Sequence, residues 1–259
     1  MSGTRSPSPK APAIKTVNGP VLLAVAHGAG AREDANDGFL AFCRELGERL
    51  PDFEVRPAVL NGEPSLETVM ARVGEDRGIV VYPHFLSDGY YVSKALPRRL
   101  ENLGRSDARI LTPLGLMAGL SGLVARNMRR ELSSAQLPPI VVVAHGSAMG
   151  KRPRKAAETF ASSLGREMGQ EGIPCLFLEE APLFEEALPI IGANFAVVRY
   201  FAANGGHSEE DVANALKLQG HAGYLSPPVG LMPGVAELVT REIAEVLGVR
   251  HGERQRLTA

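Results

Sequence analysis

The amino-acid sequence predicts an α/β protein built from two similar, doubly wound parallel-sheet lobes related by internal duplication. Four segments recur in the same order in the two halves of the chain: 21–28 and 139–146, 58–66 and 176–184, 79–92 and 195–208, and 111–117 and 225–232. His27 and His145 end the first pair of segments and are 118 positions apart (145 − 27). Leu116 and Leu231 belong to the last pair and are 115 apart (231 − 116). A nearly constant offset over four segments indicates a repeat.

Each half begins with an apolar, partly β-branched run, at residues 22–26 and 140–144. Such a run is typical of a buried strand. Amphipathic helices are predicted next, over 34–50 and 154–169. In the first of them apolar residues recur at spacings of three and four.

The remaining predicted elements alternate in the same way. They are second strands at 54–60 and 174–178, short helices at 65–73 and 183–190, third strands at 78–82 and 196–200, a further helix, short strands at 110–112 and 224–226, and a last helix that closes each half. Strands that alternate with helices favour parallel sheets covered on both faces.

The repeat also sets the predicted domain boundaries. The first lobe spans 20–134 and the second spans 135–249, with a linker near 133–139 (SSAQLPP) that breaks the helical pattern. Residues 1–19, rich in Ser, Pro and basic side chains, are predicted to be a disordered tail, and 250–259 a frayed C-terminal tail.

Composition narrows the class of protein. Of the 259 residues 44% are hydrophobic and 22% charged, and the formal net charge is −1, which gives no general attraction to nucleic acid. No apolar run reaches the roughly 18 residues of a membrane span. Two cysteines, Cys43 and Cys175, form no C-x-x-C pair, which favours a reducing, cytoplasmic location. The sequence leaves open whether the protein is a monomer or a homodimer.

Two histidines are the first candidates for chemistry. His27 and His145 each end the first strand of their half and precede a glycine. Ligands of open parallel sheets bind at the carboxyl ends of the strands, so both imidazoles are expected to face a cleft. Gly146 and Ser147 follow His145 and are candidate substrate contacts.

A third histidine follows the third strand of the second half. His207 lies after Gly205 and Gly206, glycines that would let a flat ligand approach the backbone, and before a helix start predicted at Ser208. By topology His207 and His145 are expected to converge. Two imidazoles can bind Co²⁺, Fe²⁺, Ni²⁺ or Zn²⁺, or accept protons near neutral pH.

The first half departs from this pattern. Tyr91 stands at the position equivalent to His207 (207 − 91 = 116). His84 follows the third strand and is expected to contribute to the metal site from the first half, with Asp88 as a carboxylate partner or substrate contact. The alternative for His84 is a histidine packed between the lobes.

Weaker candidates lie nearby. Glu179 and Glu180 could attract a cation or orient an imidazole, but solvated loop charges are the more common reading of such residues. The basic run 151–155 could meet acidic groups of a substrate or simply begin a helix. No phosphate-binding loop, nucleophile elbow or H-E-x-x-H motif is present.

Taken together, these motifs resemble a known family. AHGAG, GEPSL and PHFLSDGYY in the first half, and AHGSA, EAPLF and YFAANGGH in the second, resemble the sirohydrochlorin chelatases of the CbiX/SirB type over roughly residues 20–245. These are class II, ATP-independent tetrapyrrole chelatases, and a tandem two-lobe form is one of the forms that the family takes.

The resemblance implies a lyase that inserts Co²⁺ or Fe²⁺, with Ni²⁺ or Zn²⁺ as alternatives, into sirohydrochlorin or a related tetrapyrrole for cobalamin or sirohaem synthesis. It implies no cofactor beyond that metal, and a small-molecule tetrapyrrole as the partner. Carried over by position, His145, His207 and His27 match the family's histidines. The second half is therefore expected to handle the metal.

The residues by themselves leave two other functions open. A non-catalytic metal or tetrapyrrole carrier would explain Tyr91 at a histidine position. A histidine-dependent phosphoryl-transfer enzyme would need arginines such as Arg32, Arg152 and Arg154, which follow the AHG motifs, but the order of motifs does not favour it.

Overall fold

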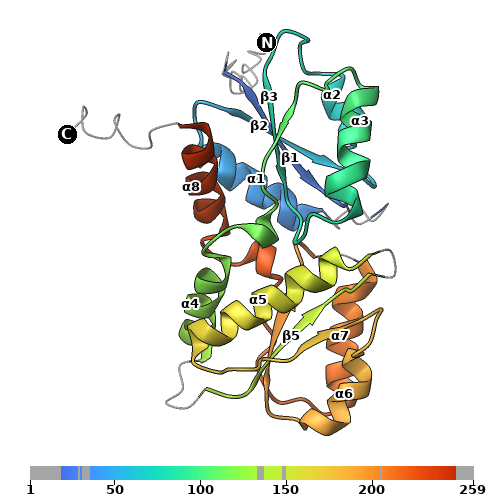
Figure 1. The fold of residues 1–259 in the computed structure, drawn as a ribbon, viewed down its shortest axis with the longest axis vertical. Coiled ribbons are helices and arrows are strands. Elements are labelled where there is room, and N and C mark those ends of the chain that lie inside the picture. The colour runs from blue at the N-terminus through green and yellow to red at the C-terminus, as the bar shows by residue number, and fades with distance from the viewer. Residues whose placement is uncertain are drawn as a thin grey trace, which may run out of the picture.

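The protein forms two lobes, each built on a parallel sheet flanked by helices (Figure 1). The computed structural model describes residues 19–28, 30, 36–132, 137–147, 150–204 and 206–248, and for 206–211 only the backbone. The predicted tails lie outside the described residues, apart from Gly19. Within the described part no helix has the length and apolar character needed to cross a bilayer.

The first sheet has the strand order β2-β1-β3-β4, and all its strands are parallel. Its strands are β1 (Val21–Ala26), β2 (Glu54–Val59), β3 (Ile79–Pro83) and β4 (Arg109–Ile110). The central strand β1 is buried along its whole length, as its continuous apolar run predicts. The doubly wound arrangement predicted for the first half is therefore confirmed.

The second sheet repeats this plan with the order β6-β5-β7. Its strands are β5 (Ile140–Ala144), β6 (Cys175–Phe177) and β7 (Ala196–Tyr200). The strand predicted at 224–226 is reduced to a single bridge between Val197 and Leu225. Pro227 and Pro228 follow directly, and they have no backbone N–H with which to extend a ladder.

The helices follow the predicted alternation. In chain order they are α1 (Asp37–Arg49), α2 (Leu66–Met70), the π-helical turn η1 (Tyr91–Ala95), α3 (Leu96–Asn102), the 3₁₀ turn η2 (Leu114–Leu116), α4 (Leu120–Leu132), α5 (Arg152–Met168), α6 (Phe184–Ile191), α7 (Gly206–Leu218), the 3₁₀ turn η3 (Val229–Leu231) and α8 (Val235–Leu247).

The sequence predicts that the last helix of each half closes its own lobe, and this prediction is wrong. Instead, α8 packs along α1 of the first lobe and α4 packs along α5 of the second (Figure 1). Asn127 of α4 also donates a hydrogen bond to the Pro233 carbonyl just before α8 (3.0 Å). The two sequence repeats therefore exchange their terminal helices in space.

This exchange produces one apolar core shared by both lobes. Leu22 and Ala24 of β1 join it together with Val142 of β5 and the exchanged helices. The opposite face of β1, which includes Val21 and Leu23, packs on a separate layer formed by α2 and α3. A continuous core under both sheets fixes the lobes against each other.

Candidate functional site

The two strand-end histidines occupy equivalent places. His27 follows β1 and His145 follows β5, and each is succeeded by a glycine with positive φ, 84° at Gly28 and 83° at Gly146. The glycine is required at Gly28, where a Cβ would lie 2.0 Å from the Asn61 carbonyl oxygen. The chain therefore turns sharply away and leaves each imidazole at the end of a rigid strand.

Both imidazoles face one cavity between the lobes. It has a volume of about 370 Å³, and its lining includes His27, His84 and His145. The predicted position at the carboxyl ends of the strands is thus confirmed for His27 and His145. Each of the two lobes contributes one of these imidazoles to the same space.

A carboxylate accompanies the histidine of the second lobe. Glu179 Oε2 lies 3.3 Å from His145 Nδ1, and both side chains are more than half exposed, at 55% and 54%. The backbone strengthens this pairing, since the Glu179 N–H donates to the His145 carbonyl (3.0 Å). Asn61 makes the equivalent backbone bond to His27 (2.8 Å), so the first lobe has an amide where the second has a carboxylate.

The neighbouring carboxylate has a different role. Glu180 accepts hydrogen bonds from the Ser147 N–H (3.0 Å) and from the Arg154 guanidinium (3.0 Å). It therefore ties the loop after β5 to α5. Glu179 and Glu180 are equally weak candidates by residue type alone. The repeat alignment with Asn61 is the signal that distinguishes Glu179, because Asn61 and Glu179 make the equivalent backbone bond to the strand-end histidine.

Tyr91 occupies the equivalent of His207 and contacts His27. The two ring centroids are 4.5 Å apart in an edge-on arrangement, and Tyr91 is 44% exposed. Its ring also stacks on Phe85, with centroids 6.4 Å apart. The first lobe therefore pairs its histidine with an aromatic ring.

His207 itself lies in the first turn of α7, which begins at Gly206, two residues before the predicted start. Its side chain is outside the part that the structure describes, and so is Gly205. The predicted convergence of His207 and His145 therefore stays a prediction. Among the side chains that are described, no group of three or more His, Cys, Asp or Glu is arranged to hold a metal ion.

The expectation that His84 supplies a metal ligand does not fit its surroundings. The side chain is fully buried, its Nε2–H donates to the Ala202 carbonyl (2.8 Å) and its Nδ1 accepts from the Tyr82 hydroxyl (3.0 Å). Both ring nitrogens are thus engaged, and a histidine needs a free lone pair to bind a metal. The alternative of a histidine packed between the lobes describes it correctly.

Burial also affects the proton affinity of His84. It lowers the pKa from 6.5 to about 4, outweighing the Ala202 hydrogen bond, which raises it. As the pH falls, the unfolded chain binds this proton near pH 6.5, whereas the folded chain binds it only near pH 4. The free energy of unfolding should therefore fall between about pH 6.5 and about pH 4, by up to about 3 kcal/mol. Urea unfolding at several pH values would measure this, and the His84→Gln variant should lack that part of the pH dependence.

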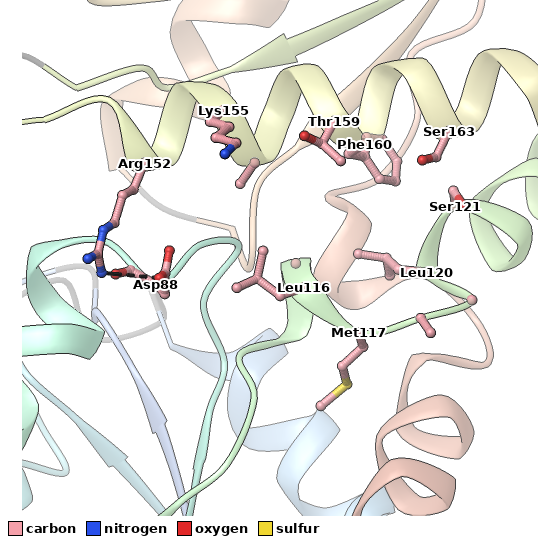
Figure 2. A pocket seen from close by; sticks show the side chains of 14 residues that line it. Asp88, Leu116, Met117, Leu120, Ser121, Arg152, Lys155, Thr159, Phe160 and Ser163 are labelled. Atoms are coloured by element: carbon pink, nitrogen blue, oxygen red, sulfur yellow. Dashed lines mark hydrogen bonds and ion pairs between the residues drawn. The ribbon is translucent and has the colours of Figure 1, made fainter.

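Asp88 does not lie in the cavity with the strand-end histidines, where it was expected as a carboxylate partner or substrate contact. Its carboxylate pairs with Arg152 of α5 (Oδ2 to Nη1, 3.1 Å), which links the two lobes. This pair lies at one end of a second hollow, which has a volume of about 550 Å³. Figure 2 shows Lys155 on α5 and Leu116 on η2 facing the same hollow. Asp88 therefore lines this hollow, and it is absent from the lining of the cavity that holds the strand-end histidines.

Both halves of the chain match the same protein family. The CbiX family model matches residues 21–131 and matches again at residues 139–246. The chain belongs to the CbiX family. The double match also agrees with the duplication read from the sequence.

Two relatives extend this finding. The chain is 23% identical over 266 residues to a probable sirohydrochlorin cobaltochelatase of Halobacterium salinarum, which covers 86% of this chain and 90% of the relative. It is 29% identical to CbiX, described as the terminal enzyme for biosynthesis of siroheme in denitrifying bacteria, with a TM-score of 0.72 over 87% of this chain and 98% of that one.

A more distant structure shares the fold. The cobalt complex of the sirohydrochlorin chelatase SirB from Bacillus subtilis subspecies spizizenii is 18% identical, with a TM-score of 0.69 over 91% of this chain and 98% of that chain. The CbiX-family fold is therefore present over nearly the whole described chain.

Proposed function

We propose that this CbiX-family protein inserts Co²⁺ or Fe²⁺ into sirohydrochlorin without nucleotide hydrolysis. The observation that carries the proposal is the pair of strand-end imidazoles, His27 and His145, that face one interlobe cavity from opposite lobes. The names of the relatives support the choice of macrocycle.

In this proposal the second lobe handles the metal. His145 and His207 bind the incoming ion, and the Glu179 carboxylate beside His145 orients the imidazole or offsets the charge of the ion. Imidazole nitrogen suits cobalt, iron, nickel and zinc, so the choice among them depends on supply as well as on the site.

Proton removal falls to imidazoles near the macrocycle. Each divalent ion that enters the ring displaces two pyrrole N–H protons, and these need acceptors in the cavity. His27 lines the cavity from the first lobe and accepts one of them, and His145 accepts another after it releases the metal. Both side chains are exposed, so each can pass its proton on to water.

In this proposal the plane of the macrocycle lies between the two lobes. The exposed aromatic ring of Tyr91 provides an apolar face beside His27, while the backbone of Gly146, Ser147, Gly205 and Gly206 allows a flat ligand to approach the second lobe. Asp88 is left out of this arrangement because its carboxylate is paired with Arg152 in the other hollow.

The direct test mixes purified protein with sirohydrochlorin and Co²⁺, and separately Fe²⁺, under anaerobic conditions. The absorbance change of the macrocycle should be accelerated well beyond a blank without protein. Stoichiometric binding of metal or macrocycle without acceleration would instead favour a carrier, the alternative suggested by Tyr91 at the histidine position.

A cytoplasmic location is also part of the proposal. Cys43 and Cys175 are both free, and burial raises the pKa of both thiols, for Cys175 to about 12. Unpaired thiols suit a reducing compartment.

The oligomeric state is a separate question. Separation of the purified protein by size would decide between a monomer and a homodimer.

A further inference from the structure

Two hydrogen bonds cross between the lobes at the candidate site. His84, just after β3, donates from Nε2 to the Ala202 carbonyl of the second lobe (2.8 Å). Tyr200, at the end of β7, donates its hydroxyl to the Leu86 carbonyl of the first lobe (3.0 Å). All four residues line the cavity that also contains His27 and His145.

The two donors occupy equivalent positions in the repeat. Val25 in β1 pairs with Pro83, and its repeat equivalent Val143 in β5 pairs with Arg199. The next residues along the third strands, His84 and Tyr200, are therefore equivalent, with an offset of 116 (200 − 84).

The two acceptors are equivalent by the same offset (202 − 86). Gly115 donates to the Phe85 carbonyl (3.0 Å) and Gly230 donates to the Phe201 carbonyl (3.0 Å). A Cβ on either glycine would lie 2.0 Å from the next carbonyl oxygen, that of Leu86 or Ala202. Each lobe therefore donates a hydrogen bond from an equivalent residue of the repeat, His84 or Tyr200, to the equivalent carbonyl of the other lobe.

Both donors are fixed in place. His84 is fully buried against the rings of Phe39 and Phe42, with centroid distances of 5.3 and 4.6 Å. Tyr200 is 4% exposed and stacks on Phe160 at 4.6 Å. Burial raises the pKa of Tyr200, which keeps its hydroxyl protonated as a donor.

We propose that His84, Leu86, Tyr200 and Ala202 form a reciprocal clasp, in which His84 and Tyr200 are positioning residues for the opposite lobe. Five residues after Ala202 comes His207, and five residues after Leu86 comes Tyr91. His84 of the first lobe therefore positions the segment that carries His207 of the second. Likewise Tyr200 positions the segment that places Tyr91 on His27.

The clasp gives the first lobe a role although Tyr91 replaces a histidine there. The metal-handling residues proposed for the second lobe depend on a hydrogen bond that the first lobe supplies. This functional consequence rests on the proposed function, whereas the clasp itself does not.

Amide hydrogen exchange of the full chain tests the clasp without metal. His84→Phe keeps the aromatic packing but removes the donor, so exchange should rise about tenfold or more in residues 201–204. Tyr200→Phe should raise exchange in residues 85–89 instead. His84→Gln, whose amide N–H has a similar reach to Nε2, should restore slow exchange in 201–204.

A stability control separates positioning from general loosening. Leu188→Ala truncates a buried side chain in the outer core of the second lobe, away from the clasp. It should lower the melting temperature without the crossed exchange pattern. If His84→Phe leaves 201–204 unchanged, or if Leu188→Ala reproduces its pattern, the clasp is wrong.

Cobalt binding then tests the consequence for the site. Titration with Co²⁺ alone should show about tenfold weaker affinity in His84→Phe and near-normal affinity in His84→Gln, as expected for a residue that orients a ligand through its support. Normal affinity in His84→Phe would overturn the positioning of His207. If the wild-type protein binds no cobalt while the crossed exchange pattern appears, the proposed function fails and the clasp stands.

Discussion

His145→Ala should lower the rate of metal insertion by about 100- to 1,000-fold. The side chain ends β5, faces the interlobe cavity and has a carboxylate 3.3 Å from its Nδ1. It serves in the proposal both as metal ligand and as proton acceptor, and loss of one positioned acid–base group alone costs about 10²- to 10⁴-fold. The rate of the absorbance change with sirohydrochlorin and Co²⁺ measures the effect.

The matched control is a histidine with a structural role in the same lobe. His221 is half-buried and its Nε2 lies 2.8 Å from the Phe195 carbonyl oxygen. His221→Gln retains a donor for that carbonyl and should insert metal at the wild-type rate. An unchanged rate in His145→Ala, with the fold intact, would reject the assignment of the site to the second lobe.

Gly230→Ala should lower the free energy of unfolding by about 3 kcal/mol, at the upper end of what overpacking costs. A Cβ there would lie 2.0 Å from the Ala202 carbonyl oxygen and 2.7 Å from its carbon, and both are rigid backbone atoms. The added methyl group must displace the carbonyl that His84 holds. For a chain of this size the melting temperature should fall by roughly 6–12 °C.

A second glycine provides the control for this substitution. A Cβ at Gly78 would meet nothing within 4 Å, and its backbone is not in the positive-φ region. Gly78→Ala should therefore change stability by less than about 0.5 kcal/mol. Equal losses in the two variants would mean that the close approach at Gly230 is not what requires a glycine there.

The first prediction concerns a feature that differs between the two halves, and the second concerns one that they share. The second lobe pairs His145 with Glu179, whereas the first pairs His27 with the Tyr91 ring and has Asn61 at the carboxylate position. The reciprocal clasp is retained in both lobes, with His84 on one side and Tyr200 on the other. The two lobes therefore differ at the strand-end histidines while the contact that joins them has kept its two-fold character.

Some features of the site followed from local sequence alone. The repeat offset predicted that His27 and His145 lie at equivalent strand ends. Because ligands of parallel sheets bind at the carboxyl ends of the strands, both histidines were also expected to face a cleft. The amphipathic spacing predicted α1 and α5 to within a few residues. These predictions succeed because strand and helix periodicity depends on neighbours in the chain.

Other features depended on contacts between residues far apart. His84 and Asp88 follow the same strand and both carry polar side chains, yet His84 bonds to Ala202 at the cavity and Asp88 to Arg152 in a different hollow. Neither partner can be inferred from spacing, because Ala202 presents only a backbone carbonyl and Arg152 belongs to an unremarkable basic run.

The sequence by itself therefore determined the duplication, the strands and helices of each half, and the strand-end histidines. Only the tertiary structure decided that α4 and α8 are exchanged between lobes, that Glu179 accompanies His145 and that His84 joins the lobes. The physical reason lies in the duplication itself. Two halves with the same apolar pattern offer each last helix two similar docking faces, and the choice between them is made by long-range packing and the path of the connecting turns, which local periodicity does not encode.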